Sequence, residues 1–204
     1  MLNGIQRRKI RNFRRDLLVW GKSNSRSFLW RRKPSVYNIL IAEFFLQRTR
    51  APQAEKQFKI FIKRYPSFLK LKDVSVKELG KYFIPLGLKK RIKTFKKLAR
   101  FVSERYNGRI PTEYNLLMKF PGVGDYTASA VEVFALNHKR PLIDANTIRI
   151  FSRLLGKKMS REEGKRSKLI KECATYFSSL GDNPRRSNWL LLDYGATINL
   201  KKLL

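Results

Sequence analysis

Two glycines bracket one apolar residue in the segment 120–127, which reads Phe-Pro-Gly-Val-Gly-Asp-Tyr-Thr. Gly122 and Gly124 permit a tight hairpin whose amide groups point outward at the start of the following helix. Such amides at a helix N-terminus bind phosphate groups. Amphipathic patterns on both sides predict a helix–hairpin–helix unit. Because a bare G-x-G pattern has little specificity, an ordinary glycine-rich connection between two helices stays open as an alternative.

Two carboxylates stand at unusual places in the sequence. Asp144 closes the apolar run 141–143 and opens a predicted helix that carries Ile148 and Phe151. It is either a helix N-cap or a functional carboxylate at that position. Glu43 is almost the only charge in the apolar helix predicted over 39–46. Burying it costs several kcal/mol unless it is paired or its pKa rises, and a raised pKa suits a general acid. The alternative is that Glu43 lies on a solvent-exposed edge of its helix.

The charge balance indicates a polyanionic partner. The 204 residues include 46 Lys and Arg against 15 Asp and Glu, a formal net charge of +31. Self-repulsion of that size opposes compaction, so nucleic acid is the first candidate, ahead of a membrane surface or RNA packing. The single cysteine, Cys173, and the single histidine, His138, exclude an intramolecular disulfide and any Cys-based zinc or iron–sulfur site, and argue against a His-rich metal site.

No apolar run approaches the roughly 20 residues that span a bilayer. Together with the single cysteine, which is compatible with a reducing compartment, this favours a soluble intracellular protein, in the cytoplasm or nucleoid, that binds no membrane. We also expect a monomer. A basic organelle presequence in the first fifteen residues is a weaker alternative.

Helical periodicity runs through most of the chain and predicts an all-α fold of about ten helices. One apolar stripe runs from Ala51 to Tyr65 and another from Ile92 to Tyr106. Ser75 with Glu78, and Ser160 with Glu163, are typical of capping boxes at helix starts. Period-two alternation is nowhere long enough to predict a sheet.

The hairpin, Asp144 and Glu43, in their order along the chain, resemble the helix–hairpin–helix DNA glycosylase superfamily of the endonuclease III and MutY type. Further segments match family segments in register over nearly the whole chain. They are 13–18 with 28–31, then 43–49, 108–111 and 192–196.

This resemblance implies two helical lobes, a six-helix barrel over 36–141 and a second lobe from 1–35 and 142–204. Double-stranded DNA with a mispaired or damaged base would lie between the lobes. Asp144 would stabilise the cationic sugar as the flipped base departs, or assist the attacking water. Glu43 would offer that base a proton or a hydrogen bond.

The resemblance also implies a set of DNA contacts and a cation site. The hairpin amides at Gly122, Val123 and Gly124 would hold a phosphate. Carbonyl groups of Met118, Phe120 and Val123 would hold a monovalent cation in many relatives.

The resemblance further implies three side chains that enter the DNA. Gln47 and Arg48 would occupy the space left in the base stack, and Leu88 would wedge at the orphaned base. Residues such as Gln47 and Arg48 more often simply end a helix at the surface. Arg31 is a further expected DNA contact.

Two departures from the family pattern narrow the expected activity. Where bifunctional relatives carry a Schiff-base lysine, this sequence has Tyr126, so we expect a monofunctional glycosylase without strand cleavage. By its position, the resemblance implies that Tyr126 is a third catalytic residue beside Asp144 and Glu43. The family's terminal four-cysteine loop is missing at 195–199, so we expect no iron–sulfur cluster and no other cofactor apart from the cation.

Features of the sequence favour thymine or uracil opposite guanine as the target. The segment 85–89, Pro-Leu-Gly-Leu-Lys, resembles the thymine-type wedge loop, whereas MutY relatives have paired tyrosines at positions 88 and 89 and an added C-terminal domain, which we do not expect here. Adenine opposite guanine or 8-oxoguanine is the second reading. A non-catalytic helix–hairpin–helix DNA-binding module is the alternative of another class, but a pure binder needs neither Asp144 nor Glu43.

Overall fold

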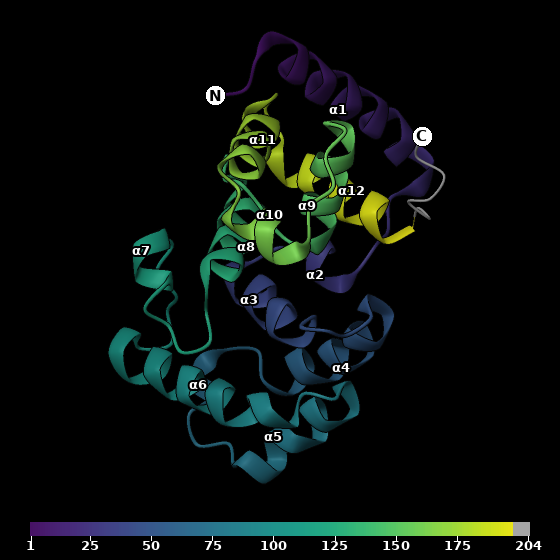
Figure 1. Ribbon diagram of the computed structural model, residues 1–204. Coiled ribbons are helices and arrows are strands. Elements are labelled where there is room, and N and C mark those ends of the chain that lie inside the picture. The colour runs from purple at the N-terminus through teal and green to yellow at the C-terminus, as the bar shows by residue number, and fades with distance from the viewer. Residues whose placement is uncertain (198–204) are drawn as a thin grey trace. The chain divides into compact units, whose positions relative to one another are not determined.

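The computed structural model describes residues 1–197, which form helices and no strands (Figure 1). They fall into two compact units. Unit 1 combines Met1–Arg26 with the chain from Asn137 onward, and unit 2 is Ser27–Leu136. The all-α prediction is confirmed.

The boundaries between the units differ from the predicted ones at 35/36 and 141/142. Trp30 packs edge-on against Phe58, with ring centroids 5.3 Å apart, so the segment around it belongs to unit 2. Asn137 accepts a hydrogen bond from the Arg185 amide at 3.0 Å, which ties it to unit 1. Both boundaries therefore follow long-range contacts that the local pattern does not record.

Unit 2 is built around a core of aromatic rings. Phe45 packs edge-on against Phe61 and Phe83, and Phe95 contacts Phe44, Phe61 and Phe83. In this core α3 packs against α4 and α8, and α5 packs against α6. The helices are α2 (Leu29–Arg32), α3 (Val36–Phe45), α4 (Ala51–Arg64), α5 (Val76–Phe83), α6 (Ile92–Tyr106), α7 (Tyr114–Leu117) and α8 (Asp125–Leu136). Three 3₁₀ turns join them, η1 (Phe68–Leu71), η2 (Ile84–Leu86) and η3 (Lys89–Arg91).

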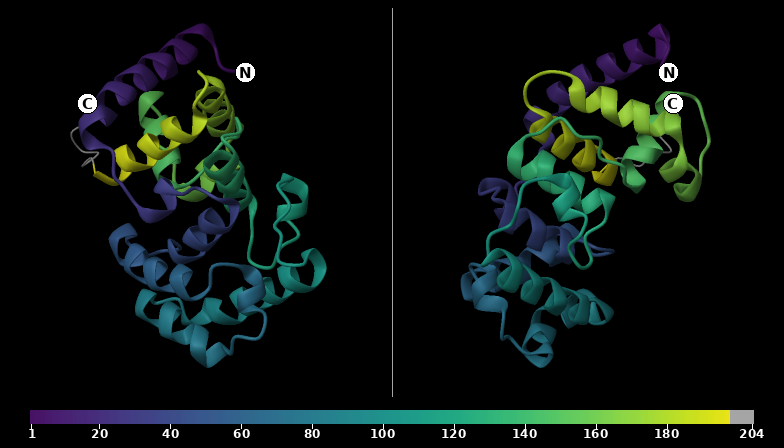
Figure 2. Two further views of the ribbon diagram at one scale, coloured as in Figure 1. Left: turned by 180° about the vertical axis from the view of Figure 1, so that it is seen from behind. Right: turned by 90° about the vertical axis from the view of Figure 1, so that its left-hand side faces the viewer.

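Unit 1 joins the N-terminal helix to the C-terminal part of the chain. Its helices are α1 (Gly4–Asn24), α9 (Ala145–Leu154), α10 (Arg161–Arg166), α11 (Lys168–Ser179) and α12 (Pro184–Thr197). Helices α1 and α12 run side by side (Figure 2). A second core lies between them and α9 and α11, with Leu17, Phe151 and Phe177 buried in it. Asp193 on α12 is fully buried, and it accepts hydrogen bonds from the Arg26 amide at 3.0 Å and from Arg26 Nε at 2.7 Å.

The predicted apolar stripes and the Ser160 capping box are confirmed, whereas the Ser75 capping box is only half present. The two apolar stripes lie on α4 and α6, where Phe58, Phe61 and Phe95 are completely buried. The capping box at Ser160 is present. Ser75 caps α5 through the Glu78 amide, but the Glu78 carboxylate bonds Lys81 instead of returning to Ser75. Among residues 1–197, no helix is long and apolar enough to cross a membrane.

Candidate active site

The glycine segment forms a tight turn between α7 and α8, as predicted. The Val123 amide donates to the Phe120 carbonyl at 3.0 Å, and the Ala128 amide donates to the Gly124 carbonyl at 2.9 Å. Gly122 has a φ of +80°, which side chains rarely adopt, so glycine is required there. The preceding helix α7 has only four residues, shorter than the amphipathic helix predicted there.

The turn is held tightly against neighbouring helices of unit 2. A Cβ at Gly122 would lie 2.6 Å from Thr94 Cγ2 and 3.0 Å from Phe44 Cζ, so only glycine fits this approach. The Tyr114 hydroxyl donates to Asp125 Oδ1 at 2.7 Å and thereby ties α7 to the first turn of α8. Val123 is buried, whereas Gly122 and Gly124 are exposed. The exposed glycines keep the helix start accessible to an anion such as phosphate.

Glu43 is buried beside this turn. It is 8% exposed and lies on α3 between Ala42 and Phe44, both of which are fully buried, so the alternative of a solvent-exposed edge is wrong. Phe44, its neighbour in the chain, is one of the two residues that lie against Gly122. The structure therefore places Glu43 and the turn in one part of unit 2. A role for Glu43 at a flipped base stays a prediction.

Helix α8, which packs against α3, carries a second buried carboxylate that was not identified from the sequence. Glu132 on α8 is 7% exposed, with Val131 and Val133 fully buried on either side. The signal that pointed to Glu43, a lone charge in an apolar helix, also holds for Glu132. Tyr126 is half-buried in the first turn of the same helix, and its catalytic involvement stays a prediction.

The two loops predicted to enter DNA are joined by hydrogen bonds. The Thr49 hydroxyl donates to the Leu86 carbonyl at 3.2 Å, and Gln53 Nε2 donates to the Pro85 carbonyl at 2.7 Å. This pairing places the turn that carries Gln47 and Arg48 beside the segment that carries Leu88.

Their side chains differ in exposure. Arg48 is exposed and has a φ of +57°, a strained conformation of the kind found at functional sites. The Oε1 atom of Gln47 is buried and accepts no hydrogen bond within the residues described. Leu88 is only 7% exposed, while Gly87 is exposed at the tip of its loop. Insertion of Gln47, Arg48 and Leu88 into DNA stays a prediction.

Arg31 lies on α2 in unit 2. It is half-buried, and its guanidinium carbon sits 5.2 Å from the centroid of the Phe28 ring. The stacking holds the side chain through a cation–π contact. Its expected contact with DNA stays a prediction.

Asp144, in unit 1, is the N-cap of α9. Its Oδ1 atom accepts from the Thr147 amide at 2.7 Å, and its own amide donates to Thr147 Oγ1 at 2.7 Å, so both halves of a capping box are present. Its Oδ2 atom accepts from Asn146 Nδ2 at 3.2 Å. The N-cap reading is thus confirmed. It does not exclude the functional one, because a capped carboxylate is held in a fixed position.

Burial sets the protonation behaviour of this carboxylate. Desolvation raises the pKa of Asp144, and the hydrogen bonds from Thr147 and Asn146 offset part of that rise. The group is therefore a weaker acid than a free aspartate, yet its ionised form is stabilised by fixed donors. Such a carboxylate can stabilise a developing positive charge or accept a proton from water.

A chain of hydrogen bonds connects Asp144 to the end of α12. Asn146 Oδ1 accepts from Arg149 Nη2 at 2.8 Å, and the same nitrogen donates to the Gly195 carbonyl at 2.7 Å. A Cβ at Gly195 would lie only 2.6 Å from Asn146 Cβ. Asn146 and Arg149 were not identified from the sequence, because their link to Gly195 joins segments 46 positions apart along the chain.

The monovalent-cation site implied at the carbonyl groups of Met118, Phe120 and Val123 stays a prediction. The Phe120 carbonyl already accepts the Val123 amide, and Met118 is 39% exposed. Within residues 1–197, no group of three or more His, Cys, Asp or Glu side chains is placed to hold a metal ion. The expectation that the protein needs no iron–sulfur cluster stays a prediction, and residues 198 and 199 of the predicted loop position lie outside the described part.

Known proteins resemble this chain in both sequence and structure, although no family model matches it. It is 35% identical over 160 residues to the thymine-DNA glycosylase of Aeropyrum pernix, and this match covers 78% of this chain and 72% of that protein. It is 34% identical over 151 residues to the thymine/uracil-DNA glycosylase of Pyrobaculum aerophilum, covering 73% and 66%. The adenine DNA glycosylase of Buchnera aphidicola is 28% identical over 91% of this chain, but that match spans only 53% of its own length.

A solved structure of a thermostable thymine-DNA glycosylase superposes with a TM-score of 0.84 and 31% identity, over 94% of this chain and 88% of that one. At this coverage the likeness extends over both units of the chain. By sequence and by fold, the chain belongs to the helix–hairpin–helix DNA glycosylase superfamily, whose members hydrolyse N-glycosidic bonds.

Proposed function

We propose that this protein is a monofunctional mismatch glycosylase that removes thymine or uracil opposite guanine from double-stranded DNA. The observation that carries the proposal is the carboxylate of Asp144, held by Thr147 and Asn146 at the start of α9. The names of the two relatives at 34–35% identity support thymine and uracil as the target bases.

In the proposed reaction the target nucleotide is flipped out of the duplex and the bond between C1′ and the base nitrogen breaks. The bonding electrons leave with the base, and a water oxygen forms the new bond to C1′. The Asp144 carboxylate stabilises the positive charge that develops on the sugar and accepts the proton that the water loses. Glu43 faces the base and donates a hydrogen bond or proton to it as it departs.

Tyr126 supports the monofunctional assignment. A lyase step needs an amine that attacks C1′ and forms a Schiff base, and a phenol at that position has no such chemistry. The reaction accordingly ends at an abasic site with both strands intact. The glycine turn contributes binding, because its exposed helix start suits a phosphate of the DNA backbone.

Adenine opposite guanine or 8-oxoguanine is the second candidate substrate. The match to the Buchnera adenine glycosylase, which covers 91% of this chain, favours it over other bases. Lower identity than in the thymine relatives places it second.

Single-turnover cleavage of labelled duplexes tests the proposal. The duplexes contain G·T, G·U, G·A or 8-oxoguanine·A, and each reaction is read with and without alkali. We expect alkali-dependent breaks at G·T and G·U. Breaks confined to the adenine pairs would transfer the assignment to adenine, and breaks without alkali would refute the monofunctional reading.

Asp144→Asn identifies the catalytic group. Asparagine caps helices as well as aspartate does, so the variant should fold while losing at least about 10²–10³-fold in rate. Asp73→Asn, at an exposed position in unit 2, is the matched control and should cleave at the wild-type rate. Tight binding without breaks on any duplex would leave the non-catalytic module as the better reading.

A further inference from the structure

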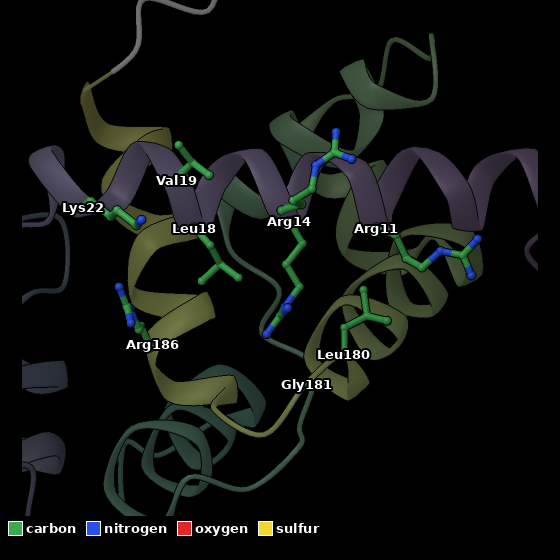
Figure 3. Close-up of a pocket in the computed structure, with 9 residues that line it drawn as sticks. Arg11, Arg14, Leu18, Val19, Lys22, Leu180, Gly181 and Arg186 are labelled. Carbon is green, nitrogen blue, oxygen red and sulfur yellow. The ribbon is translucent and has the colours of Figure 1, made fainter.

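A cavity of about 540 Å³ opens along α1 in unit 1, where that helix passes the turn between α11 and α12 (Figure 3). We call it the α1 groove. Cationic side chains predominate in its lining, namely Arg11, Arg14, Arg15, Lys22 and Arg186. None of the lining residues is acidic. The α1 groove therefore presents donors and positive charge to whatever occupies it.

Arg14 is the most enclosed of these cations. Its side chain reaches from α1 toward Gly181, and a Cβ at Gly181 would lie 2.6 Å from Arg14 Nη2 (Figure 3). The Nε atom of Arg14 is buried and has no hydrogen-bond partner within the residues described. Burial lowers the pKa of Arg14, against an opposing effect of Asp182. A buried donor without an acceptor is costly, so an anion in the α1 groove would relieve this cost.

Two further cations of the α1 groove are available to a ligand. Lys22 and Arg186 are exposed, lie toward one end of the groove, and form no ion pair with a carboxylate among the described residues (Figure 3). Arg15 and Arg11 are partly engaged, since Arg15 Nε pairs with Asp16 at 3.0 Å and Arg11 Nη1 contacts the Tyr176 hydroxyl at 3.4 Å. The free positive charge is thus concentrated at Arg14, Lys22 and Arg186.

The shape of the α1 groove favours an extended anion. Leu18 and Leu180 are half-buried in its lining and Val19 is 63% exposed, so apolar surface lies between the cations. The phosphodiester backbone offers anionic oxygens at regular intervals with apolar sugar carbons between them. Guanidinium groups bind phosphate oxygens in a fork geometry. An acidic peptide fits less well, because its own amide donors would face side chains that are donors too.

We propose that the α1 groove is a phosphate-binding site whose occupant is the backbone of DNA, a contact separate from that of the glycine turn. The proposal rests on the proposed function only in taking DNA as the partner. It needs no catalytic turnover, because a backbone contact in the α1 groove positions the duplex without reading its sequence.

The test measures binding of an undamaged 20-base-pair duplex by fluorescence anisotropy over a range of salt concentrations. The groove variant is Lys22→Gln with Arg186→Gln. Both positions are exposed, so the variant should fold. The matched control is Arg8→Gln with Lys9→Gln, two exposed cations of α1 that do not line the groove. Arg14→Gln is measured as a second groove variant, with thermal unfolding of each protein as a check.

Each lost phosphate contact should reduce the slope of log affinity against log salt by about 0.9. We therefore expect the groove variant to lose about 1.8 from the slope and the control to keep the wild-type slope. Equal slopes in the groove variant and the control would overturn the proposal. Because the duplex is undamaged, the result is independent of whether the protein cleaves any base.

Direct binding of two other anions distinguishes which kind of anion the α1 groove holds. Sodium tripolyphosphate and a hexaglutamate peptide are each titrated into the wild type and the groove variant, and binding is measured by calorimetry. Weak binding of both, alongside the change in DNA slope, supports the DNA backbone as occupant. If tripolyphosphate binds tightly to the wild type alone and the DNA slope is unchanged, the site serves a free phosphorylated compound and the DNA assignment is refuted. The same pattern for hexaglutamate would replace phosphate by an acidic peptide.

Discussion

Replacing Gly195 by alanine should disturb Asp144 without touching it. The added Cβ would lie 2.6 Å from Asn146 Cβ and 2.9 Å from Asn146 Cγ. Both atoms belong to the rigid base of the side chain, so the clash cannot be relieved by rotating a flexible end. Asn146 also donates to Asp144 Oδ2 at 3.2 Å, and the displacement is therefore transmitted to the carboxylate.

The size of the effect follows from these distances. Carbon atoms in contact prefer a separation of about 3.5–4.0 Å, so the two side chains must move apart by about 1 Å. Overpacking of this kind costs about 1–3 kcal/mol of unfolding free energy. A displacement of about 1 Å in a catalytic group can lower the rate about 10²-fold. The Gly195 carbonyl also accepts from Arg149 at 2.7 Å, so the same shift strains a second contact of this chain of bonds.

The assay pairs chemical denaturation with single-turnover cleavage of a G·T duplex under saturating enzyme. Gly4→Ala is the control, because a Cβ at Gly4 meets no atom within 4 Å, and it should leave both measurements near wild type. A loss of stability with an unchanged rate would show that Asn146 does not position Asp144. Wild-type stability and rate together would refute the packing argument itself.

Four further predictions concern the pH dependence of the rate, the pH dependence of stability, backbone strain and thiol reactivity. Burial raises the pKa of Asp144, so its ionised form is lost, and the cleavage rate should fall, at a higher pH than for an ordinary aspartate. Thr147→Val removes a hydrogen bond that lowers this pKa, so the fall in rate should move to higher pH. No movement relative to Thr147→Ser would contradict the assignment. The raised pKa of Asp144 also stabilises the native protein only while this carboxyl is protonated, so the free energy of unfolding should decline as the pH rises through that pKa. Denaturation curves of Asp144→Asn at the same pH values should not show this decline. Gly122 has a φ of +80°, and a Cβ there would lie 2.6 Å from Thr94, so Gly122→Ala should lower the free energy of unfolding by about 1–3 kcal/mol in chemical denaturation. A Cβ at Gly124 meets no atom within 4 Å, so Gly124→Ala should leave stability unchanged. Burial raises the pKa of the Cys173 thiol to about 11, so a disulfide reagent at pH 8 should react with it only after unfolding, and rapid modification of the native protein would contradict this.

Local features of this protein were determined by the sequence alone. The stripes on α4 and α6, the turn at Gly122 and the N-cap at Asp144 each depend on residues within a few positions of one another. Helical spacing, glycine conformation and capping are local physics, so their pattern can be read directly. The register of several motifs along the chain then indicated the superfamily, which the relatives confirm.

Only the tertiary structure decided which helix faces meet and which polar groups they enclose. The sequence left Glu43 with two readings, and packing of α3 on α8 buried it together with the overlooked Glu132. Arg149 reaches Gly195, and the α1 groove joins residues of α1 to the turn before α12. Periodicity marks an apolar face but not its partner, because that choice depends on contacts between distant segments.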